Sequence, residues 1–375
     1  MNFMLALVAL ILAGCKFGAS GSNEILQADR PASPQPRANC GRARCAGLAQ
    51  IERSGTHACF PADNKNTEKP PTCEISAVMN WSNRLLAAND KSFKDLGAFV
   101  SFSPDDPQTK IEPFKELNRG AKFEDFASCD GFDMVTTAFD RINKDSSWDG
   151  YNMLFAWPRA QPELAKVVPS KSGPSGQTYS AGVRDKLQSI LGNPYFKIEA
   201  LACMPKPQPR VVFGVRETGK SYKDFSYVAK LITVSFEWKN KLLTLGTDWT
   251  AAYEFDPNLD HKKWGLSSLE WDEGQQGLLA LTTLEDNDSG SMPTFRSQIW
   301  LIRDLKSPPA IYNDADGKPF TAPYKWEDIA PRGKGRYIVV SDDDRSTFAA
   351  GGQVQPRALN QFRWSELSLG QGARR

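Results

Sequence analysis

One pattern of residues occurs five times along the 375-residue chain and constrains its fold more than any other feature. Each copy has an apolar pair around a small or acidic residue, then a polar turn, then a short apolar run. Two short strands joined by a tight polar turn are the signature of a β-hairpin. The copies begin at Glu74, Phe123, Ile198, Leu266 and Trp326. A hairpin repeated in this way predicts a repeat architecture made of β-sheet units.

A third segment, in which apolar and polar residues alternate, follows each hairpin. Alternation predicts a half-buried outer strand rather than a helix. The segments are GAFVSFSPD, YNMLFAWPR, YVAKLITVSFE, SQIWLIRD and NQFRWSEL. The copies are further apart than the roughly 40 to 45 residues of a compact four-stranded blade, so inserted loops are expected. We place these loops at Pro104 to Lys122, Arg141 to Gly150, Pro162 to Ser180 and Pro308 to Tyr324.

Repeated short sheets favour a radial arrangement, which leaves only short and protected strand edges. We therefore expect an all-β chain that folds as a β-propeller of five to seven blades. Six blades are preferred, because KLLTLGTDWTAAYEFDP supplies part of a sixth. We expect the segment from Cys40 to Asp63 to supply the strand that closes the ring. A β-sandwich, the competing fold, would not require five aligned copies of one hairpin.

The N-terminus has the pattern of an export signal. An apolar run from Met4 to Leu12 precedes Ala13-Gly14-Cys15, which is the h-region and small-residue cleavage site of a signal peptide. The run is shorter than the roughly 20 apolar residues that span a bilayer. Leu12 to Cys15 resembles the lipobox of bacterial lipoproteins, which implies cleavage before Cys15 and lipidation of its thiol. A plain signal peptide that ends near Ala19 is the alternative.

These features divide the chain into a lipoprotein signal peptide (1–14), a polar, Pro- and Ser-rich tether anchored by its lipid (15–39) and a propeller domain (40–375) with a cysteine-rich start. We expect a lipid-anchored location in the cell envelope, periplasmic or surface-exposed, with the membrane as one partner. Lys16 after Cys15, by resemblance to lipoprotein sorting rules, favours the outer membrane. The net charge of +2 gives no reason to expect a nucleic-acid partner.

Six cysteines remain when Cys15 is set aside, and an even number in an exported chain predicts disulfides. They are Cys40, Cys45, Cys59, Cys73, Cys129 and Cys203. Six cysteines allow 15 pairings, and the sequence does not choose among them. Their spacing is not that of a zinc finger or ribbon.

Alignment of the five copies places one residue of each in the same column. Equivalent positions of the innermost strands face the central channel of a propeller, so this column predicts a ring of three carboxylates and two hydroxyls around the axis. The ring consists of Ser76, Glu124, Glu199, Ser267 and Glu327.

The ends of the second strands predict a second ring near the axis. It consists of Asp90, Phe139, Arg216, Thr283 and Asp342. Converging carboxylates raise one another's pKa unless a cation joins them. Two arrangements are therefore open: Glu124, Glu199 and Glu327 bind Ca²⁺, which takes oxygen ligands, or they hold the blades in register through hydrogen bonds to backbone N–H groups and to Arg216.

Other chemistry has less support in the sequence. Glu285 to Gly290 and Asp342 to Asp344 are read as solvated acidic turns, because the EF-hand glutamate is missing. The only histidines, His57 and His261, lie outside the repeats and are expected on the surface. No G-x-S-x-G motif is present, so a catalytic serine triad is not predicted.

Two motifs connect the repeat to a known family. Ile198 to Ala202 and Val212 to Arg216 resemble paired elements of the esterase-like, phytase-like β-propellers of bacteria. The resemblance covers roughly residues 70 to 350. It implies a propeller of five to seven blades with an acidic central funnel, and it does not imply one particular activity.

Three functions follow as hypotheses. The first is a membrane-tethered propeller that binds a small-molecule ligand or an envelope protein at its funnel. The second is a calcium-dependent, phytase-like or esterase-like hydrolase that uses the three glutamates. The third is an envelope scaffold without a small-molecule ligand.

Overall fold

The computed structural model describes residues 45–60, 72–90, 97–141, 146–168, 171–172, 178–205, 208–257, 263–286, 294–342 and 357–371. All of them belong to one compact unit, Pro36–Arg375. The expected signal peptide and tether, together with Cys15, Cys40 and His261, lie outside these ranges. None of the helices in the described ranges is long and apolar enough to cross a membrane.

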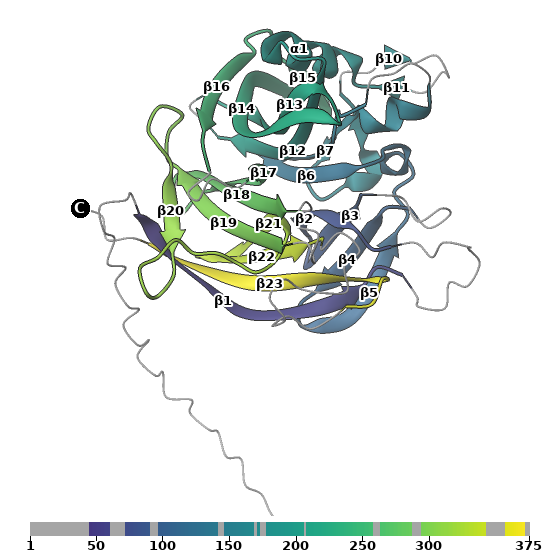
Figure 1. Ribbon diagram of the computed structural model, residues 1–375. Coiled ribbons are helices and arrows are strands. Elements are labelled where there is room, and N and C mark those ends of the chain that lie inside the picture. The colour runs from purple at the N-terminus through teal and green to yellow at the C-terminus, as the bar shows by residue number, and fades with distance from the viewer. Residues whose placement is uncertain are drawn as a thin grey trace, which may run out of the picture. The chain divides into compact units, whose positions relative to one another are not determined.

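The unit is built almost entirely of β-strands, arranged as five antiparallel modules (Figure 1). Module 1 contains β2 (Ile75–Trp81), β3 (Arg84–Asn89), β4 (Phe99–Ser103) and β5 (Asp106–Glu112). Module 2 contains β6 (Phe123–Cys129), β7 (Phe132–Thr137), β8 (Leu154–Pro158) and β9 (Lys166–Val167). Module 3 contains β12 (Tyr195–Met204), β13 (Arg210–Ser221) and β14 (Asp224–Lys239), with β15 (Leu242–Leu245) and β16 (Thr250–Phe255) both paired to β14. Module 4 contains β17 (Trp264–Asp272), β18 (Gly277–Asp286), β19 (Thr294–Ile302) and β20 (Ala310–Asn313). Module 5 contains β21 (Trp326–Gly333), β22 (Arg336–Ser341), β23 (Gln361–Gln371) and β1 (Cys45–Ala58).

The N-terminal strand completes the last module, as expected for the segment from Cys40 to Asp63. Strand β1 pairs antiparallel with β23 along its length, from Gly47 opposite Gln371 to Ala58 opposite Gln361. It also pairs in parallel with β20, so modules 4 and 5 share one eight-stranded sheet. A disulfide between Cys59 and Cys73 joins the end of β1 to the start of module 1.

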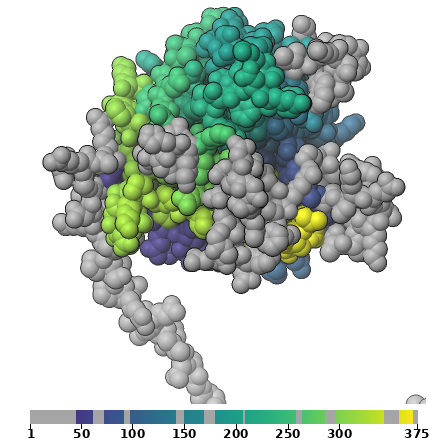
Figure 2. Space-filling model, in the orientation of Figure 1, coloured from purple at the N-terminus to yellow at the C-terminus, as the bar shows by residue number. Residues whose placement is uncertain are grey.

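The first strands of the five modules surround one axis. Each contacts the first strand of the next module in the order β2, β6, β12, β17, β21 and back to β2. Five hydrophobic clusters fill the spaces between neighbouring modules, one for each pair. Modules 3 and 4 lie next to one another in the space-filling view, in teal and green (Figure 2). The arrangement is β-propeller-like.

Two buried aspartates tie the first strands together on this axis. Asp125 Oδ2 on β6 accepts hydrogen bonds from the Leu201 N–H (2.8 Å) and the Leu269 N–H (3.1 Å) on the next two strands. Asp328 on β21 accepts from the Val78 N–H (2.6 Å) and from Ser268 Oγ (2.7 Å).

The two aspartates also influence each other's titration, and their raised pKa values favour one proton retained by the pair. Burial and the second carboxyl together raise the pKa of Asp125 well above its usual range. Burial raises the pKa of Asp328 to about 7, although its hydrogen bonds act in the opposite direction. The shared proton lets two acids lie side by side in the interior, where a pair of negative charges would be strongly unfavourable.

The predicted hairpins are confirmed, and all five alternating segments form third strands. The predicted loops were partly wrong, because the fourth strands β5, β9 and β20 lie within them. The strand β5 (DPQTKIE) is mostly polar, and β9 (KV) and β20 (AIYN) are only two and four residues long, so none of them shows an extended apolar pattern. The preferred sixth blade was also wrong: β15 and β16 arise from its sequence and extend module 3.

The helix α1 (Ala181–Leu191) was not predicted. The remaining described elements are the small hairpin of β10 (Lys171–Ser172) and β11 (Thr178–Tyr179) and three short 3₁₀ helices at Leu117–Arg119, Ser146–Tyr151 and Pro162–Leu164.

Candidate functional site

The first strand of every module contains a β-bulge at the same position. In each strand one extra residue interrupts the pairing with the second strand. The five extra residues are Ser76, Glu124, Glu199, Ser267 and Glu327, which form the column predicted from the repeats. A bulge redirects a side chain from its place in the regular pleat. The sequence column therefore corresponds to a real structural equivalence.

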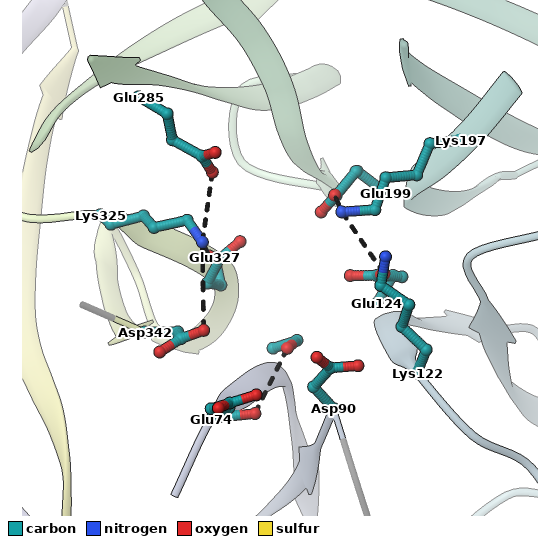
Figure 3. Close-up of a pocket in the computed structure, with 11 residues that line it drawn as sticks. Glu74, Asp90, Lys122, Glu124, Lys197, Glu199, Glu285, Lys325, Glu327 and Asp342 are labelled. Atoms are coloured by element: carbon teal, nitrogen blue, oxygen red, sulfur yellow. Dashed lines mark hydrogen bonds and ion pairs between the residues drawn. The ribbon is translucent and has the colours of Figure 1, made fainter. Parts of the chain in front are cut away.

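Four of these five residues line a cavity of about 290 Å³ at the start of the first strands (Figure 3). We call it the carboxylate cavity. Its lining holds seven carboxyl groups, three lysines and one serine: Glu74, Ser76, Asp90, Lys122, Glu124, Lys197, Glu199, Glu285, Lys325, Glu327 and Asp342. Figure 3 shows these side chains converging from several modules on one space.

The three lysines were not predicted, although a signal for them exists. Lys122, Lys197 and Lys325 each lie two residues before a predicted glutamate. Side chains two positions apart on a strand point to the same face, so each Lys-x-Glu pair projects into the cavity. Lys325 Nζ lies 2.8 Å from a Glu327 oxygen, and Lys197 makes an ion pair with Glu199.

Glu124 is held less closely by its cations. Its Oε1 lies 3.8 Å from Lys122 Nζ and 3.7 Å from Lys197 Nζ. It receives no hydrogen bond from the described residues. Lys122 is drawn away from it by Asp140, whose Oδ2 accepts a hydrogen bond from the ammonium group at 2.9 Å.

Module 4 contributes to the site in a different way. Where three other modules have lysine and glutamate, it has Gly265 and Ser267. The space above Gly265 is occupied by Arg216 of module 3: a Cβ at Gly265 would lie 2.8 Å from Arg216 Cγ. Ser267 is fully buried and hydrogen-bonds to Thr283 (3.1 Å). It therefore lies outside the cavity lining.

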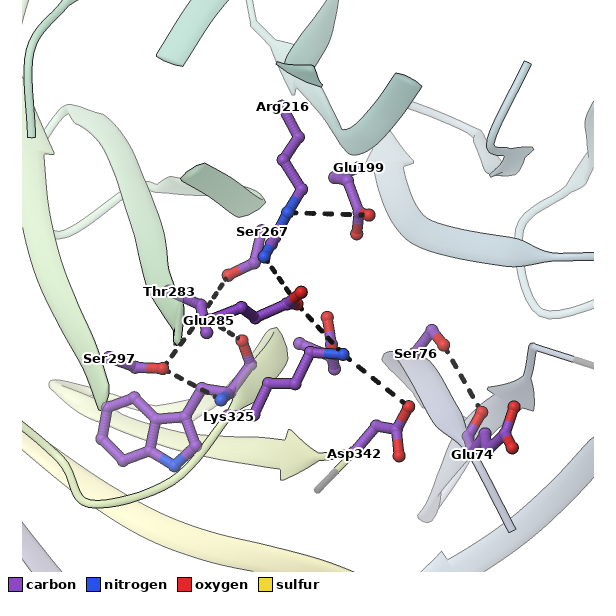
Figure 4. A network of polar contacts seen from close by, with 12 residues as sticks. Glu74, Ser76, Glu199, Arg216, Ser267, Thr283, Glu285, Ser297, Lys325 and Asp342 are labelled. Atoms are coloured by element: carbon purple, nitrogen blue, oxygen red, sulfur yellow. Dashed lines mark hydrogen bonds and ion pairs between the residues drawn. The ribbon is translucent and has the colours of Figure 1, made fainter. Parts of the chain in front are cut away.

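Arg216 contacts two residues of the cavity lining and connects the cavity to module 4 (Figure 4). Its guanidinium donates a hydrogen bond to Glu285 Oε1 at 2.6 Å and lies 4.0 Å from a Glu199 oxygen. Glu285 also pairs with Lys325 at 3.2 Å. The interpretation of Glu285 as part of a solvated turn was wrong, because β18 extends far enough to bring its carboxylate back to the axis.

The second predicted ring is brought together in part. Asp90 and Asp342 line the cavity, and Arg216 contacts the lining residues Glu199 and Glu285. Thr283 is instead part of a buried hydroxyl network, with Ser297 Oγ at 2.9 Å and the Trp326 carbonyl at 2.8 Å. Phe139 is fully buried in the hydrophobic cluster between modules 2 and 3.

The environments of the cavity carboxyls separate their pKa values. Burial, together with the charge of Glu199, raises the pKa of Glu124 well above its usual range. Burial also raises the pKa of Glu327 to about 7. For Glu199 and Glu285 burial acts in the same direction, but nearby cations outweigh it and lower both pKa values: Lys197 and Arg216 for Glu199, and Arg216 and Lys325 for Glu285. Protonated and ionised carboxyls therefore face one cavity at neutral pH.

The glutamates proposed as calcium ligands are paired with lysines instead. An ammonium group beside each carboxylate competes with a divalent cation for the same oxygens. In the part of the chain that the structure describes, no group of three or more Asp, Glu, His or Cys side chains is arranged to hold a metal ion.

The predicted surface position of His57 was wrong. His57 is buried beside Phe102, Phe362 and Trp364, with the Trp364 ring stacked at 6.0 Å. Burial lowers its pKa. It lies outside the carboxylate cavity, so no described histidine is available there as a base.

Disulfide bonding is confirmed for the described cysteines. Cys59 pairs with Cys73, and Cys129 pairs with Cys203, which joins the first strands of modules 2 and 3. Cys45 is also disulfide-bonded. Its predicted partner group includes Cys40, which lies outside the described residues.

Comparisons with known proteins reveal no family. No protein-family model and no curated protein matches the sequence. Among solved structures, the chain is similar to an α-L-arabinofuranosidase of Podospora anserina, with 12% identity over 88% of this chain and 98% of that one and a TM-score of 0.41. It is similar to the catalytic domain of an α-L-arabinofuranosidase of Coprinopsis cinerea, with 13% identity over 87% and 97% and a TM-score of 0.43. A mannose phosphorylase of Leishmania mexicana gives 10% identity over 85% and 88% and a TM-score of 0.38.

Proposed function

We propose that the five modules are the blades of a five-bladed β-propeller and that its carboxylate cavity binds a small, hydroxyl-rich ligand of the carbohydrate class. One observation carries the proposal: ten of the eleven lining side chains are ionisable, and the eleventh is Ser76. Lysines and protonated carboxyls donate hydrogen bonds, and ionised carboxylates accept them. A hydroxyl group does both, so a polyol satisfies both kinds of lining group.

The size and the charge of the cavity narrow the ligand further. Its volume of about 290 Å³ lies at the lower end of the roughly 300–1,000 Å³ of small-molecule sites, which suits a single sugar-sized unit. A strongly anionic ligand would meet Glu199 and Glu285, and a strongly cationic one would meet the three lysines. A neutral polar ligand avoids both penalties.

Acid–base hydrolysis is the second candidate, favoured by the divided pKa values. A carboxyl with a pKa near 7, such as Glu327, can donate a proton to a leaving oxygen. An ionised carboxylate such as Glu199 can activate water or stabilise positive charge on a sugar ring. Pairs of acids whose environments separate their pKa values divide these tasks in enzymes that cleave glycosidic bonds.

We further propose that the propeller is exported and tethered to the outer membrane by a lipid on Cys15. The pattern from Met4 to Cys15 supports this proposal, and the two disulfides of the described residues fit an oxidising compartment. Mass spectrometry of the N-terminal peptide tests it, because diacylglycerol on Cys15 adds a defined mass. An unmodified terminus near Ala19 would instead indicate a plain signal peptide.

Ligand binding is tested by thermal melts of the chain from Lys16 onward with a panel of monosaccharides, disaccharides and polyols. A ligand that binds only the folded state at 100 times its Kd adds about 2.7 kcal/mol of stability. We expect one ligand to raise the melting temperature, and Glu199→Gln to abolish that rise. Glu273→Gln, which alters an exposed carboxylate outside the cavity, is the matched control. A rise that survives in Glu199→Gln would place the ligand elsewhere.

The same ligand series separates binding from hydrolysis. If the cavity is catalytic, Glu327→Gln lowers the release of reducing sugar by about 100-fold or more and leaves the ligand-induced melting shift in place. Binding without release of product in the wild type favours a binding protein. No response to any carbohydrate favours the envelope-scaffold hypothesis, for which partner capture is the next measurement.

The calcium-dependent hydrolase remains a testable alternative. Melts in excess EDTA and in millimolar Ca²⁺ compare the metal-free and metal-saturated chain. Because lysines already neutralise the three glutamates, we expect the two curves to superimpose. A calcium-induced rise that disappears when Glu124, Glu199 and Glu327 are all changed to Gln would restore the metal site and contradict the sugar-binding role.

A further inference from the structure

A second cavity, of about 300 Å³, lies further along the same first strands. We call it the alanine pocket, and its axial and side walls include Val78, Met79, Phe126, Ala127, Glu270 and Ala330. Residues 79, 127, 270 and 330 each lie three positions after a bulge residue. At about 3.3 Å per residue, they are roughly 10 Å along the strand from that bulge. The paired aspartates Asp125 and Asp328 lie between the two cavities in sequence on their strands.

The polar groups at the edge of the alanine pocket already have partners within the fold. Asp133 accepts hydrogen bonds from the Ala160 N–H and from Ser128 Oγ, both at 2.9 Å. Asn80 donates to the Pro331 carbonyl, and Arg159 donates to the Cys129 carbonyl. These contacts leave Asp133, Asn80 and Arg159 with structural roles.

Glu270 is different. It lies on β17 among alanines and a methionine, and no hydrogen bond or ion pair joins its carboxyl to any described residue. Its side chain is only partly exposed, and a carboxylate that has lost much of its water and has no partner takes up a proton or a counter-ion. Glu270 is therefore the group in this pocket that is available to a ligand.

The electrostatic environment of Glu270 favours a cation. Burial raises its pKa well above the usual range, and the nearby Asp328 and Asp272 raise it further. The two aspartates raise the pKa because they create a negative potential at the Glu270 carboxyl. A neutral ligand would gain little from that potential, whereas a positive group would be attracted by the three acids, against the opposing charge of Arg159 at the pocket edge.

We propose that the alanine pocket binds an alkylammonium group, with the Glu270 carboxylate as its counter-ion and the walls of Val78, Met79 and Phe126 around its alkyl stem. The group is carried by a small amine or by a lysine side chain. On binding, the proton of Glu270 passes to the solvent and the carboxylate pairs with the ammonium ion. This site is separate from the carboxylate cavity and does not depend on the function proposed for it.

Titration calorimetry with hexylammonium, N-acetyl-lysine amide and the neutral hexanol tests the proposal on the chain from Lys16 onward. We expect either amine to bind, and hexanol to bind at least about tenfold more weakly. Near neutral pH the measured enthalpy should depend on the ionisation enthalpy of the buffer, because binding releases the Glu270 proton. Equal binding of hexanol would reduce the site to apolar contact and overturn the proposal.

Variants locate the site. Glu270→Gln should weaken amine binding by about tenfold or more and remove the buffer dependence, whereas the exposed Glu273→Gln should change neither. Ala127→Leu fills the pocket and should weaken binding while Glu270 is retained. Glu327→Gln should leave amine binding intact. If Glu327→Gln abolishes amine binding and Glu270→Gln does not, the amine occupies the carboxylate cavity and the inference is wrong.

Discussion

The carboxylate cavity and the alanine pocket are made from successive residues of the same strands, yet their chemistry is opposite. The cavity gathers seven carboxyls and three lysines, which satisfy one another through several ion pairs. The pocket has mainly small and apolar walls around the unpartnered Glu270. In modules 1, 2, 3 and 5 the bulge residue and the residue two places before it line the cavity. In modules 1, 2, 4 and 5 the residue three places after the bulge lines the pocket. One repeated strand can therefore support two sites whose side chains vary independently.

The contacts that join neighbouring modules also differ between the carboxylate cavity and the alanine pocket. At the cavity the modules are connected by ion pairs such as Arg216 with Glu285. On the side of the alanine pocket a covalent bond, Cys129–Cys203, connects modules 2 and 3. The aspartate pair lies between these two regions. Substitutions should therefore affect the two ends by different amounts and in different ways.

The largest effect is expected from Asp328→Ala, which removes one member of the aspartate pair that lies between the carboxylate cavity and the alanine pocket. It leaves the Val78 N–H, the Ile329 N–H and the Ser268 hydroxyl without their acceptor. At about 1–3 kcal/mol for each unsatisfied buried group, the loss should be about 5 kcal/mol. Urea unfolding measures it, with Glu273→Ala as an exposed control expected within about 0.5 kcal/mol of wild type. A loss below about 1 kcal/mol would show that the pair does not hold the strands.

Removal of the Cys129–Cys203 disulfide should have the next largest effect. The bond closes a loop with a sequence separation of 74 residues, for which the chain-entropy model gives about 4 kcal/mol. We expect the double variant Cys129→Ser and Cys203→Ser to lose about this much in urea unfolding. Amine binding should weaken more than sugar binding. Equal weakening at both sites would remove the distinction between a covalently held end and an ionic one.

Gly265→Ala should affect the carboxylate cavity alone. The added Cβ would lie 2.8 Å from Arg216 Cγ and 2.9 Å from Tyr227 Cδ1, so Arg216 must move away from Glu285. Overpacking of this kind costs about 1–3 kcal/mol. We expect that loss in thermal unfolding, together with altered ligand binding at the cavity and unchanged amine binding. Gly274→Ala, whose new Cβ would meet only a carboxylate of Asp272 at 3.1 Å, is the matched control.

The last expected effect is a change in the slope of stability against pH rather than in stability at a single pH. The pKa of Asp328 is about 7 in the folded state and about 3.9 in an unfolded chain. Between these values the folded state retains a proton that the unfolded state has released. Stability should therefore fall as pH rises from about 4 to about 7, by at most about 1.4 kcal/mol per pH unit for each proton.

Asp125→Asn tests this dependence, because the amide oxygen can still accept from the Leu201 and Leu269 N–H groups but the side chain has no titrating proton. We expect a shallower slope in urea unfolding measured between pH 4 and pH 8. The slope should not vanish, since the pKa of Glu327 is also raised to about 7. An unchanged slope would assign the titration to Glu327 and Glu270 rather than to the axial pair.

The sequence predicted the column of ring residues because aligning the five hairpin copies identifies the residues that occupy the same position in each copy. It did not reveal that every column residue is a bulge, since a bulge has no composition of its own. In a regular strand, adjacent side chains point to opposite faces. Without knowledge of the bulge, Asp125 and Asp328 could therefore not be predicted to lie on the axis next to Glu124 and Glu327. The lysines could have been found by reading the same strand face two residues earlier. The position of Glu285 could not have been found in this way, because it depends on how far β18 extends beyond its pairing with β17.

The miscounted blade has a related cause. The segment of β15 and β16 has the alternation of a new hairpin, but both strands pair with the unusually long β14. The local alternation of residues predicts that a strand forms, but it does not determine which other strand it pairs with. His57 was misplaced for the same reason: it lies on β1, whose burial depends on β23, more than 300 residues away in the chain.

The pairing of β1 with β23 sets an order of events for a newly made chain. Strand β1 cannot dock until more than 300 further residues have been synthesised, because Gly47 finds its partner at Gln371. Until then module 5 lacks its outer strand and module 4 lacks the parallel neighbour of β20. Contacts this distant in sequence form slowly. An exported chain would thus cross a membrane before its ring closes and would complete its fold only at its destination.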